Sequence, residues 1–137
     1  MVRKISSDDL NQINDLGLKY DSKFIELYNI GNYIDNEVYL LYGYEICGKL
    51  VGFIIATYIC EIIEIQLIFV DNEFRKQGIA TQLIEYLTKY QHEKILLEVS
   101  KENTEAFNLY KKLNFNVIAE RKKYYNGIDA LVMASKC

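Results

Sequence analysis

Seven stretches of the chain show the short alternating or continuous apolar pattern that is typical of β-strands. They are residues 1–5, 38–46, 50–59, 62–70, 94–99, 115–121 and 128–134. Gly48 lies between the second and third stretches, and Asn126-Gly127 lies between the last two. Both connections contain residues that favour tight turns, so both pairs of strands are predicted to form hairpins.

Four other stretches carry apolar residues at the spacing of one helix face. The first helix is predicted to end near Gly17 and the second to stop at Gly31, because glycine commonly ends helices. Two further helices are predicted over residues 79–90 and 103–113. The last should stop at Asn114, since asparagine is, after glycine, best able to take the left-handed conformation found at helix ends.

The predicted elements follow the order β-α-α-β-β-β-α-β-α-β-β. The strand at 62–70, the helix at 79–90 and the strand at 94–99 form a β-α-β unit, whose strands are parallel because a crossover helix joins them. The fold class is therefore predicted to be α/β, with a mixed sheet and helices on both faces. A length of 137 residues suits a single domain over residues 1–137.

Composition narrows the classes of function. Half of the residues are hydrophobic and about a quarter are charged, as in globular proteins. The 16 basic and 19 acidic residues give a net charge of −3. A nucleic-acid-binding protein would usually carry a basic excess, so no nucleic-acid partner is expected. The slight acidic excess suits a positively charged substrate.

The three cysteines, Cys47, Cys60 and Cys137, lie far apart and outside any metal-binding or redox spacing. We therefore expect neither a disulfide framework nor a metal site, and a reducing cytoplasm as the location. No signal-peptide pattern opens the sequence, and no apolar run reaches the ~18 residues of a membrane span, so no membrane association is expected. His92 is predicted to be a solvated loop residue, which leaves a Ser-His-Asp mechanism without support.

The sequence RKQGIA at residues 75–80 connects a predicted strand to a predicted helix. The first turn of a helix leaves about four backbone N–H groups unpaired and carries about half a positive charge, so this junction favours anions. Gly78 would let a phosphate approach the backbone without meeting a side chain. The spacing is neither GxxxxGK[ST] nor GxGxxG. A helix start with solvated basic residues is the simpler alternative.

Residues 75–80 match R-x-x-G-x-A, and residues 98–115 (EVSKENTEAFNLYKKLNF) match E-V-x-x-x-N-x-x-A-x-x-L-Y-x-x-x-G-F. Together these motifs resemble the signatures of the GNAT acetyltransferases, and most closely those of the RimI branch, the ribosomal-protein alanine N-acetyltransferases. The resemblance covers about residues 62–134, whereas residues 1–60 agree only in the order of elements. Asn114 stands where the family has glycine.

The resemblance implies acetyl-CoA as the cofactor. Its pantetheine is expected to pair with the backbone of a strand that splays from its parallel neighbour, and its pyrophosphate to lie on the amides of the following loop and helix start. Asn103 is also placed to cap the helix that follows it. The implied cofactor-binding residues are Ile68, Phe69, Val70, Arg75, Lys76, Gln77, Gly78, Ile79, Ala80, Thr81 and Asn103.

Glu98 interrupts an apolar strand, and a carboxylate partly buried there would have a raised pKa, which suits a general base at neutral pH. The resemblance implies that Glu98 deprotonates the substrate amine through water, and a glutamate at the rim of the sheet is the alternative. Glu64 is the second candidate base. On the strand of Glu64, the opposite side is predicted to consist of Ile63, Ile65, Leu67 and Phe69.

Tyr110 lies on the apolar face of its helix, so a plain core residue is one interpretation. The resemblance instead implies that Tyr110 protonates the leaving thiolate, which a phenol of pKa about 10 can do at modest cost for a thiol of pKa about 8.5. Tyr124 and Tyr125 lie at a predicted hairpin tip. The resemblance implies that they hold the first residues of a substrate peptide, with Glu64 also on the substrate side, and strand-end packing is the alternative.

The sequence thus predicts an enzyme that transfers acetyl from acetyl-CoA to an amine in a ternary complex, as a monomer or weak homodimer. A protein N-terminal α-amine, such as that of a ribosomal protein, is favoured. Such an amine is about 10 per cent neutral at pH 7, against about 0.04 per cent for lysine. Three alternatives stay open: a small-amine (polyamine or antibiotic) acetyltransferase, a non-catalytic acyl-CoA-binding module, and an interaction module with a tyrosine-rich surface.

Overall fold

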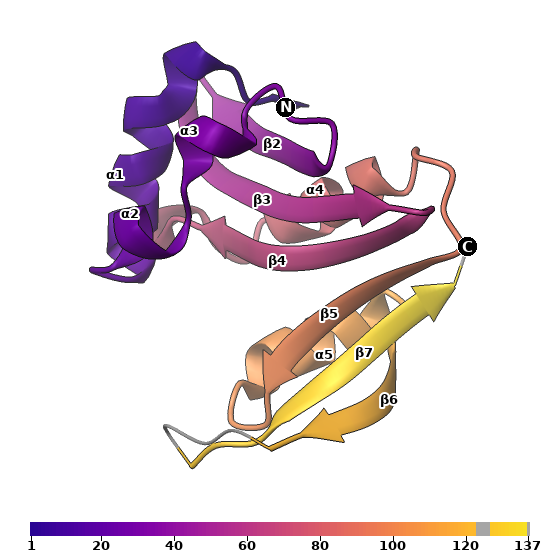
Figure 1. Cartoon of the computed structure of the whole chain (residues 1–137). Helices are drawn as coiled ribbons and strands as arrows, with labels where there is room; N and C mark the ends of the chain where they lie inside the picture. The colour runs from indigo at the N-terminus through magenta and orange to yellow at the C-terminus, as the bar shows by residue number, and fades with distance from the viewer. Residues whose placement is uncertain (123–126, 137) are drawn as a thin grey trace.

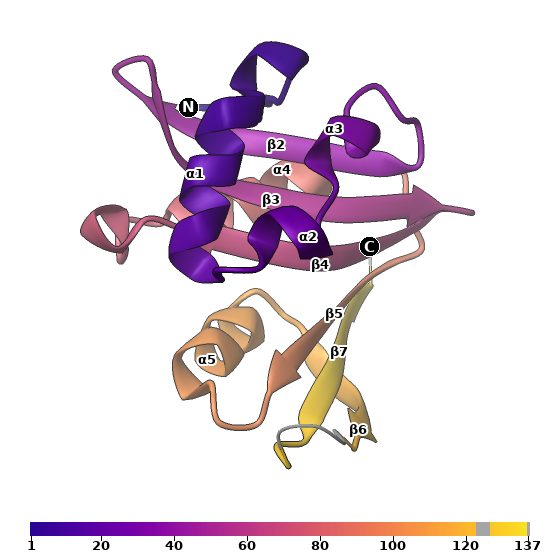
Figure 2. The same cartoon turned by 60° about the vertical axis from the view of Figure 1, so that its left-hand side comes forward.

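The computed structural model describes residues 1–122 and 127–136. Within them, seven strands form one mixed sheet in the order β1-β2-β3-β4-β5-β7-β6 (Figures 1 and 2). β4 and β5 pair in parallel, as the crossover helix between them predicted. The strands are β1 (Val2–Lys4), β2 (Tyr39–Ile46), β3 (Lys49–Ile59), β4 (Ile62–Val70), β5 (Lys94–Ser100), β6 (Asn116–Arg121) and β7 (Ala130–Lys136). The helices are α1 (Leu10–Tyr20), α2 (Phe24–Leu27), α3 (Ile30–Tyr33), α4 (Ile79–Leu87) and α5 (Thr104–Lys112).

Helices lie on both faces of the sheet, which confirms the predicted α/β class. α1, α2 and α3 cover one face of β2, β3 and β4, and α4 covers the other (Figure 2). α5 lies on the same side as α4 but covers β5, β7 and β6 (Figure 1). None of the helices formed by the described residues is both long and apolar enough to span a membrane.

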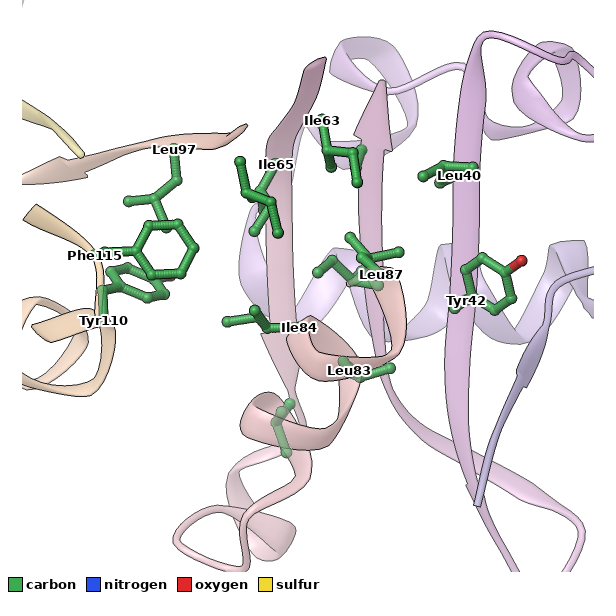
Figure 3. Close-up of a cluster of buried hydrophobic side chains, with 14 of the residues drawn as sticks. Leu40, Tyr42, Ile63, Ile65, Leu83, Ile84, Leu87, Leu97, Tyr110 and Phe115 are labelled. Atoms are coloured by element: carbon green, nitrogen blue, oxygen red, sulfur yellow. The ribbon is translucent and has the colours of Figure 1, made fainter. Parts of the chain in front are cut away.

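One apolar cluster runs beneath both α4 and α5 and so joins the two parts of the sheet. Leu83 and Leu87 of α4 belong to it together with Ile63 of β4, and so do Tyr110 and Phe115 near the end of α5 (Figure 3). Burying each such large apolar side chain contributes about 1.5–3 kcal/mol to the free energy of unfolding. A second cluster fills the space between the sheet and α1, α2 and α3.

β4 and β5 separate soon after they meet. Their register pairs residues 62–64 with residues 94–96 and extends no further in the described part of the chain. From there β4 runs on to Val70, while β5 turns away together with β7 and β6 (Figure 1). Residues 65–70 therefore present an edge of backbone N–H and C=O groups that β5 does not use, as expected for a splayed strand.

A β-bulge at Gln66 changes which side chains of β4 face which helices. Leu67 and Ile65 pair with consecutive residues of β3, so Gln66 has no counterpart there. Ile63 and Ile65 consequently lie in the cluster under α4, whereas Leu67 and Phe69 lie in the cluster under α1. The prediction that these four side chains share one side is wrong, because one extra residue inverts the alternation beyond it.

Two glycines that were predicted to end helices lie inside them. α1 continues through Gly17 to Tyr20, and a β-carbon at Gly17 would overlap the ring of Phe24. Gly17 is thus required for close packing rather than for a helix end. The second predicted helix is in fact two short helices, and Gly31 lies within α3. Phe24 of α2 and Ile30 of α3 are both buried, so each short helix is fixed by its own core residue.

The elements after β4 follow the prediction more closely, with two exceptions. α4 ends at Leu87, three residues earlier than predicted. His92 is buried rather than solvated, with its Nδ1 2.6 Å from the carbonyl oxygen of Tyr90, because the short connection to β5 turns the ring inward onto a backbone partner. α5 begins after Asn103 as its cap and is followed by Asn114 in the predicted left-handed conformation (φ 69°).

Candidate active site

The loop that leads from β4 into α4 has an open backbone at Gly78. We call residues 75–81, which comprise the last residues before α4 and its first three residues, the α4 entry loop. Gly78 caps α4 in a left-handed conformation (φ 80°), which favours glycine. A β-carbon there would meet no described atom within 4 Å. An anion can therefore approach the backbone of this loop directly.

A pocket of about 740 Å³ lies between the end of β4, the α4 entry loop and α5. This volume is within the range of small-molecule and cofactor sites. Every residue of the predicted cofactor set except Gln77 lines the pocket, and so does Tyr110. The lining consists of Tyr20, Ile68, Phe69, Val70, Phe74, Arg75, Lys76, Gly78, Ile79, Ala80, Thr81, Asn103, Glu105, Ala106, Asn108, Leu109, Tyr110 and Lys112.

Arg75 ties the α4 entry loop to the end of β4. Its Nε donates a hydrogen bond of 3.0 Å to the carbonyl oxygen of Val70. Its guanidinium carbon lies 5.6 Å from the centre of the Phe69 ring, within the range of a cation–π contact. Arg75 therefore fixes the shape of the loop in addition to bringing positive charge to the pocket.

A second link joins α1 to Asp71, the residue that follows β4. Lys19 Nζ lies 2.8 Å from Oδ2 of the buried Asp71, and this hydrogen bond is the main reason why the pKa of Asp71 is lowered. The next residue of α1, Tyr20, lines the pocket and meets the Phe69 ring edge-on, with ring centres 5.9 Å apart. Lys19 and Tyr20 were not predicted as site residues, because the first helix was expected to end near Gly17.

Tyr110 is both a core residue and a pocket residue. It is buried against Phe115, with ring centres 6.0 Å apart (Figure 3), and it lines the pocket. Burial raises the pKa of the Tyr110 phenol above its ordinary value, so the phenol is protonated at neutral pH. Each unit by which a donor's pKa exceeds that of the acceptor costs about 1.4 kcal/mol. Proton donation to a thiolate is therefore more costly than the sequence suggested, unless the thiolate is desolvated as well.

Glu98 lies on β5 beyond the point where β4 leaves. Its strand neighbours Leu97 and Val99 are buried in the cluster beneath α5, so alternation places Glu98 on the opposite face. The Glu98 side chain is 30 per cent exposed, and its Oε2 lies 3.1 Å from Nη1 of Arg121. The predicted partial burial thus holds for the side chain, although the residue as a whole is exposed. Glu98 is not among the described residues that line the pocket.

Glu64 is exposed and stands at the last position where β4 pairs with β5, opposite Leu96. Paired residues of neighbouring strands point to the same side, and so do residues two apart on one strand. Glu64, Leu96 and Glu98 therefore share a face, so the structure places both candidate bases on the side of the sheet that α5 does not cover.

The remaining predicted residues are Asn103, which precedes α5, and the pair Tyr124 and Tyr125. Asn103 accepts a hydrogen bond of 3.1 Å from the backbone N–H of Ala106 through Oδ1, and it also lines the pocket. Its predicted roles in capping and in cofactor contact are thus compatible. Tyr124 and Tyr125 lie outside the described residues.

Comparison with known proteins agrees with this geometry. The sequence model of the family described as acetyltransferase (GNAT) domain matches residues 9–137. The N-alpha-acetyltransferase of Saccharolobus solfataricus is 45% identical over 69 residues, 46% of this chain and 41% of that protein. The [ribosomal protein bS18]-alanine N-acetyltransferase of Escherichia coli is 30% identical over 106 residues, 72% of each chain. The chain spans about two fifths of the length of the N-alpha-acetyltransferases that it matches in Saccharolobus solfataricus, Sulfurisphaera tokodaii and Sulfolobus acidocaldarius.

Solved structures show the same fold. The ribosomal-protein-S18-alanine N-acetyltransferase from Escherichia coli superposes with a TM-score of 0.85 at 24% identity, covering 99% of this chain and 92% of that one. Arabidopsis thaliana NAA60, in complex with a bisubstrate analogue, superposes with a TM-score of 0.79 at 22% identity, covering 99% and 97%. Both superpositions cover nearly the whole chain, so its fold is that of these structures.

Proposed function

Since this chain belongs to the GNAT acetyltransferase family, we propose that it is an N-acetyltransferase that uses acetyl-CoA to acetylate an amine. The observation that carries this proposal is the pocket, in which the backbone edge of β4, the α4 entry loop and Tyr110 meet. A non-catalytic acyl-CoA-binding module would need the backbone edge and the loop, but it would not need a proton donor beside them.

The residues of the pocket fit coenzyme A in three respects. The backbone edge at residues 68–70 can pair with an amide-containing chain as a neighbouring strand would. The first turn of α4 offers N–H groups and the positive end of a helix dipole to a pyrophosphate. Arg75 and Lys76 add positive charge. Bound there, acetyl-CoA would supply an acetyl group activated as a thioester.

Glu98 and Tyr110 would divide the two proton transfers. Glu98 would accept a proton from the amine through water, with Glu64 on the same face as the second candidate. Tyr110, protonated and buried, holds the proton that a leaving thiolate requires. A backbone N–H near Val70 would polarise the carbonyl under attack. The roles of all four residues remain proposals.

The N-terminal α-amine of a protein, such as a ribosomal protein, is the substrate class that we favour. The names of the relatives from Saccharolobus solfataricus and Escherichia coli support it. The larger neutral fraction of α-amines at pH 7 supports it independently. A single carboxylate is too weak a base to deprotonate the lysine amine efficiently. A cytoplasmic location and a monomer or weak homodimer stay predictions.

A panel of three amines tests this substrate class with labelled acetyl-CoA and mass spectrometry. The panel consists of a peptide that starts with alanine, the same peptide blocked at its N-terminus but carrying a lysine, and spermidine. The free-terminus peptide should react more than tenfold faster than the other two. A faster lysine peptide or spermidine would contradict the N-terminal substrate. Tight binding of acetyl-CoA without transfer to any amine would support the non-catalytic module instead.

A further inference from the structure

Arg121 and Glu98 meet across an intervening strand. Glu98 of β5 is paired with Val132 of β7, and Val132 is paired on its other side with Ala119 of β6. Directly paired residues point to the same face. Ala119, and with it Arg121 two residues later, therefore share the face of Glu98. From there Arg121 reaches across β7, and its Nη1 lies 3.1 Å from Oε2 of Glu98.

A β-bulge in β6 makes this contact possible. Ile118 has no counterpart on β7, because its two neighbours pair with consecutive residues there. Had the same sequence formed a regular ladder, Arg121 would point towards α5 and Glu120 would lie on the face of Glu98. Bulges commonly redirect a side chain next to a functional site. Here the bulge gives Glu98 a cation as its neighbour instead of a second carboxylate.

Stability of the fold does not account for this ion pair. The Arg121 side chain is 68 per cent exposed, and exposed ion pairs contribute little to stability. A nearby ion pair provides a direct comparison. Lys122 Nζ lies 3.1 Å from Oδ2 of Asp129, and the Lys122 side chain is 71 per cent exposed. That second pair stands beyond the end of β6 and involves neither candidate base.

We propose, on the basis of the proposed function, that Arg121 is a positioning residue for the general base Glu98. The guanidinium holds the carboxylate on the substrate side of the sheet and favours its ionised form, because opposite charges at this distance attract. On β4 and β5, Glu64 and Lys94 are the other charged residues at positions on this face, and position 136 of β7 is paired with Lys94. Glu64 opposes the effect of Arg121, whereas Lys94 adds to it. The pair extends the reaction to lower pH than a glutamate without a cation would allow.

The test is the pH dependence of kcat/KM for a free-terminus peptide, measured at low ionic strength where charge effects are least screened. Arg121→Gln should move the acid limb that belongs to Glu98 upward by roughly half a pH unit to one unit. Arg121→Lys should restore most of the wild-type profile. The matched control Lys122→Gln should leave the profile unchanged. The amine of the peptide also titrates in this profile. Its contribution is the same for every variant, so it does not affect the difference between the profiles.

Three results would overturn the inference, and they differ in what they say of the proposed function. If Glu98→Gln is inactive but Arg121→Gln keeps the wild-type profile, Arg121 has no positioning role and the proposed function stands. If Glu98→Gln retains turnover within about fivefold of wild type, Glu98 is not the base and the inference fails with that assignment. Unchanged acetyl-CoA affinity in each variant confirms an intact fold and cofactor site. An equal shift in Lys122→Gln would also reject the specific contact in favour of general surface charge.

Discussion

β3 and β6 belong to the same sheet, yet most residues of β3 are buried whereas every residue of β6 is exposed. β3 has helices on both faces, while β6 is an edge strand in the part of the sheet that only α5 covers among the described elements. The well-covered part offers its backbone to the pocket, through the edge of β4 and the α4 entry loop. The open part carries the two side chains proposed for proton transfer, Tyr110 in the pocket and Glu98 outside its lining. Substitutions in the two parts should therefore have different kinds of effect.

The largest effect is expected in the open part and should spare the fold. Tyr110→Phe removes the proposed proton donor, so kcat should fall by about 10²- to 10⁴-fold. The affinity for acetyl-CoA, measured by calorimetry, should stay within about threefold, because the ring and its packing remain. Tyr86→Phe, on α4 in the same apolar cluster, is the control and should keep kcat. A loss below about fivefold in Tyr110→Phe would leave Tyr110 as a core residue only.

The next effect concerns stability and contrasts the two parts directly. Ile54 of β3 is fully buried, whereas Val117 of β6 is 45 per cent exposed. Ile54→Ala should lower the free energy of unfolding by about 2–5 kcal/mol through lost burial and a cavity. Val117→Ala should change it by no more than about 0.5 kcal/mol. Urea denaturation measures both, and equal losses would mean that the two parts depend equally on burial.

The smallest effect tests whether the backbone of the α4 entry loop binds the cofactor. Gly78→Asp should weaken acetyl-CoA binding by about tenfold or more, which is about 1.4 kcal/mol, because a carboxylate would meet the pyrophosphate. Gly48→Asp is a matched control, since Gly48 has nearly the same backbone (φ 78°) and equally open space around a β-carbon. Both variants pay a similar conformational cost. Equal cofactor affinity in the two would remove the entry loop from the binding site.

The sequence predicted those features that depend on local chemistry. Asn103 and Asn114 stand at the two ends of α5 as expected. Helix capping and the preference for a left-handed backbone conformation both act within a few residues. The hairpin at Gly48 formed for the same reason. The splay of β4 came from the resemblance, and the register agrees with it.

The features that were missed depend on distant packing. Gly17 was taken for a helix end, but the ring of Phe24 determines why glycine stands there. The bulges at Gln66 and Ile118 cannot be recognised from residue type, because the extra residue of a bulge is of the same kind as its neighbours in the strand. They nevertheless decide which faces carry Leu67 and Arg121. A pattern that assumes strict alternation cannot anticipate either.

The backbone edge of β4, to which we assign cofactor binding as a proposal, also bears on how such a protein changes over generations. The N–H and C=O groups of residues 68–70 are supplied by whichever residue occupies each position, except that proline has no N–H to give. Selection for cofactor binding therefore acts on the path of β4 more than on the identity of its side chains. In its proposed role as proton donor, the phenol of Tyr110 has no such freedom, because only a tyrosine combines that reach with that proton. Neutral drift can thus exchange much of the strand while a single hydroxyl group remains under strict selection.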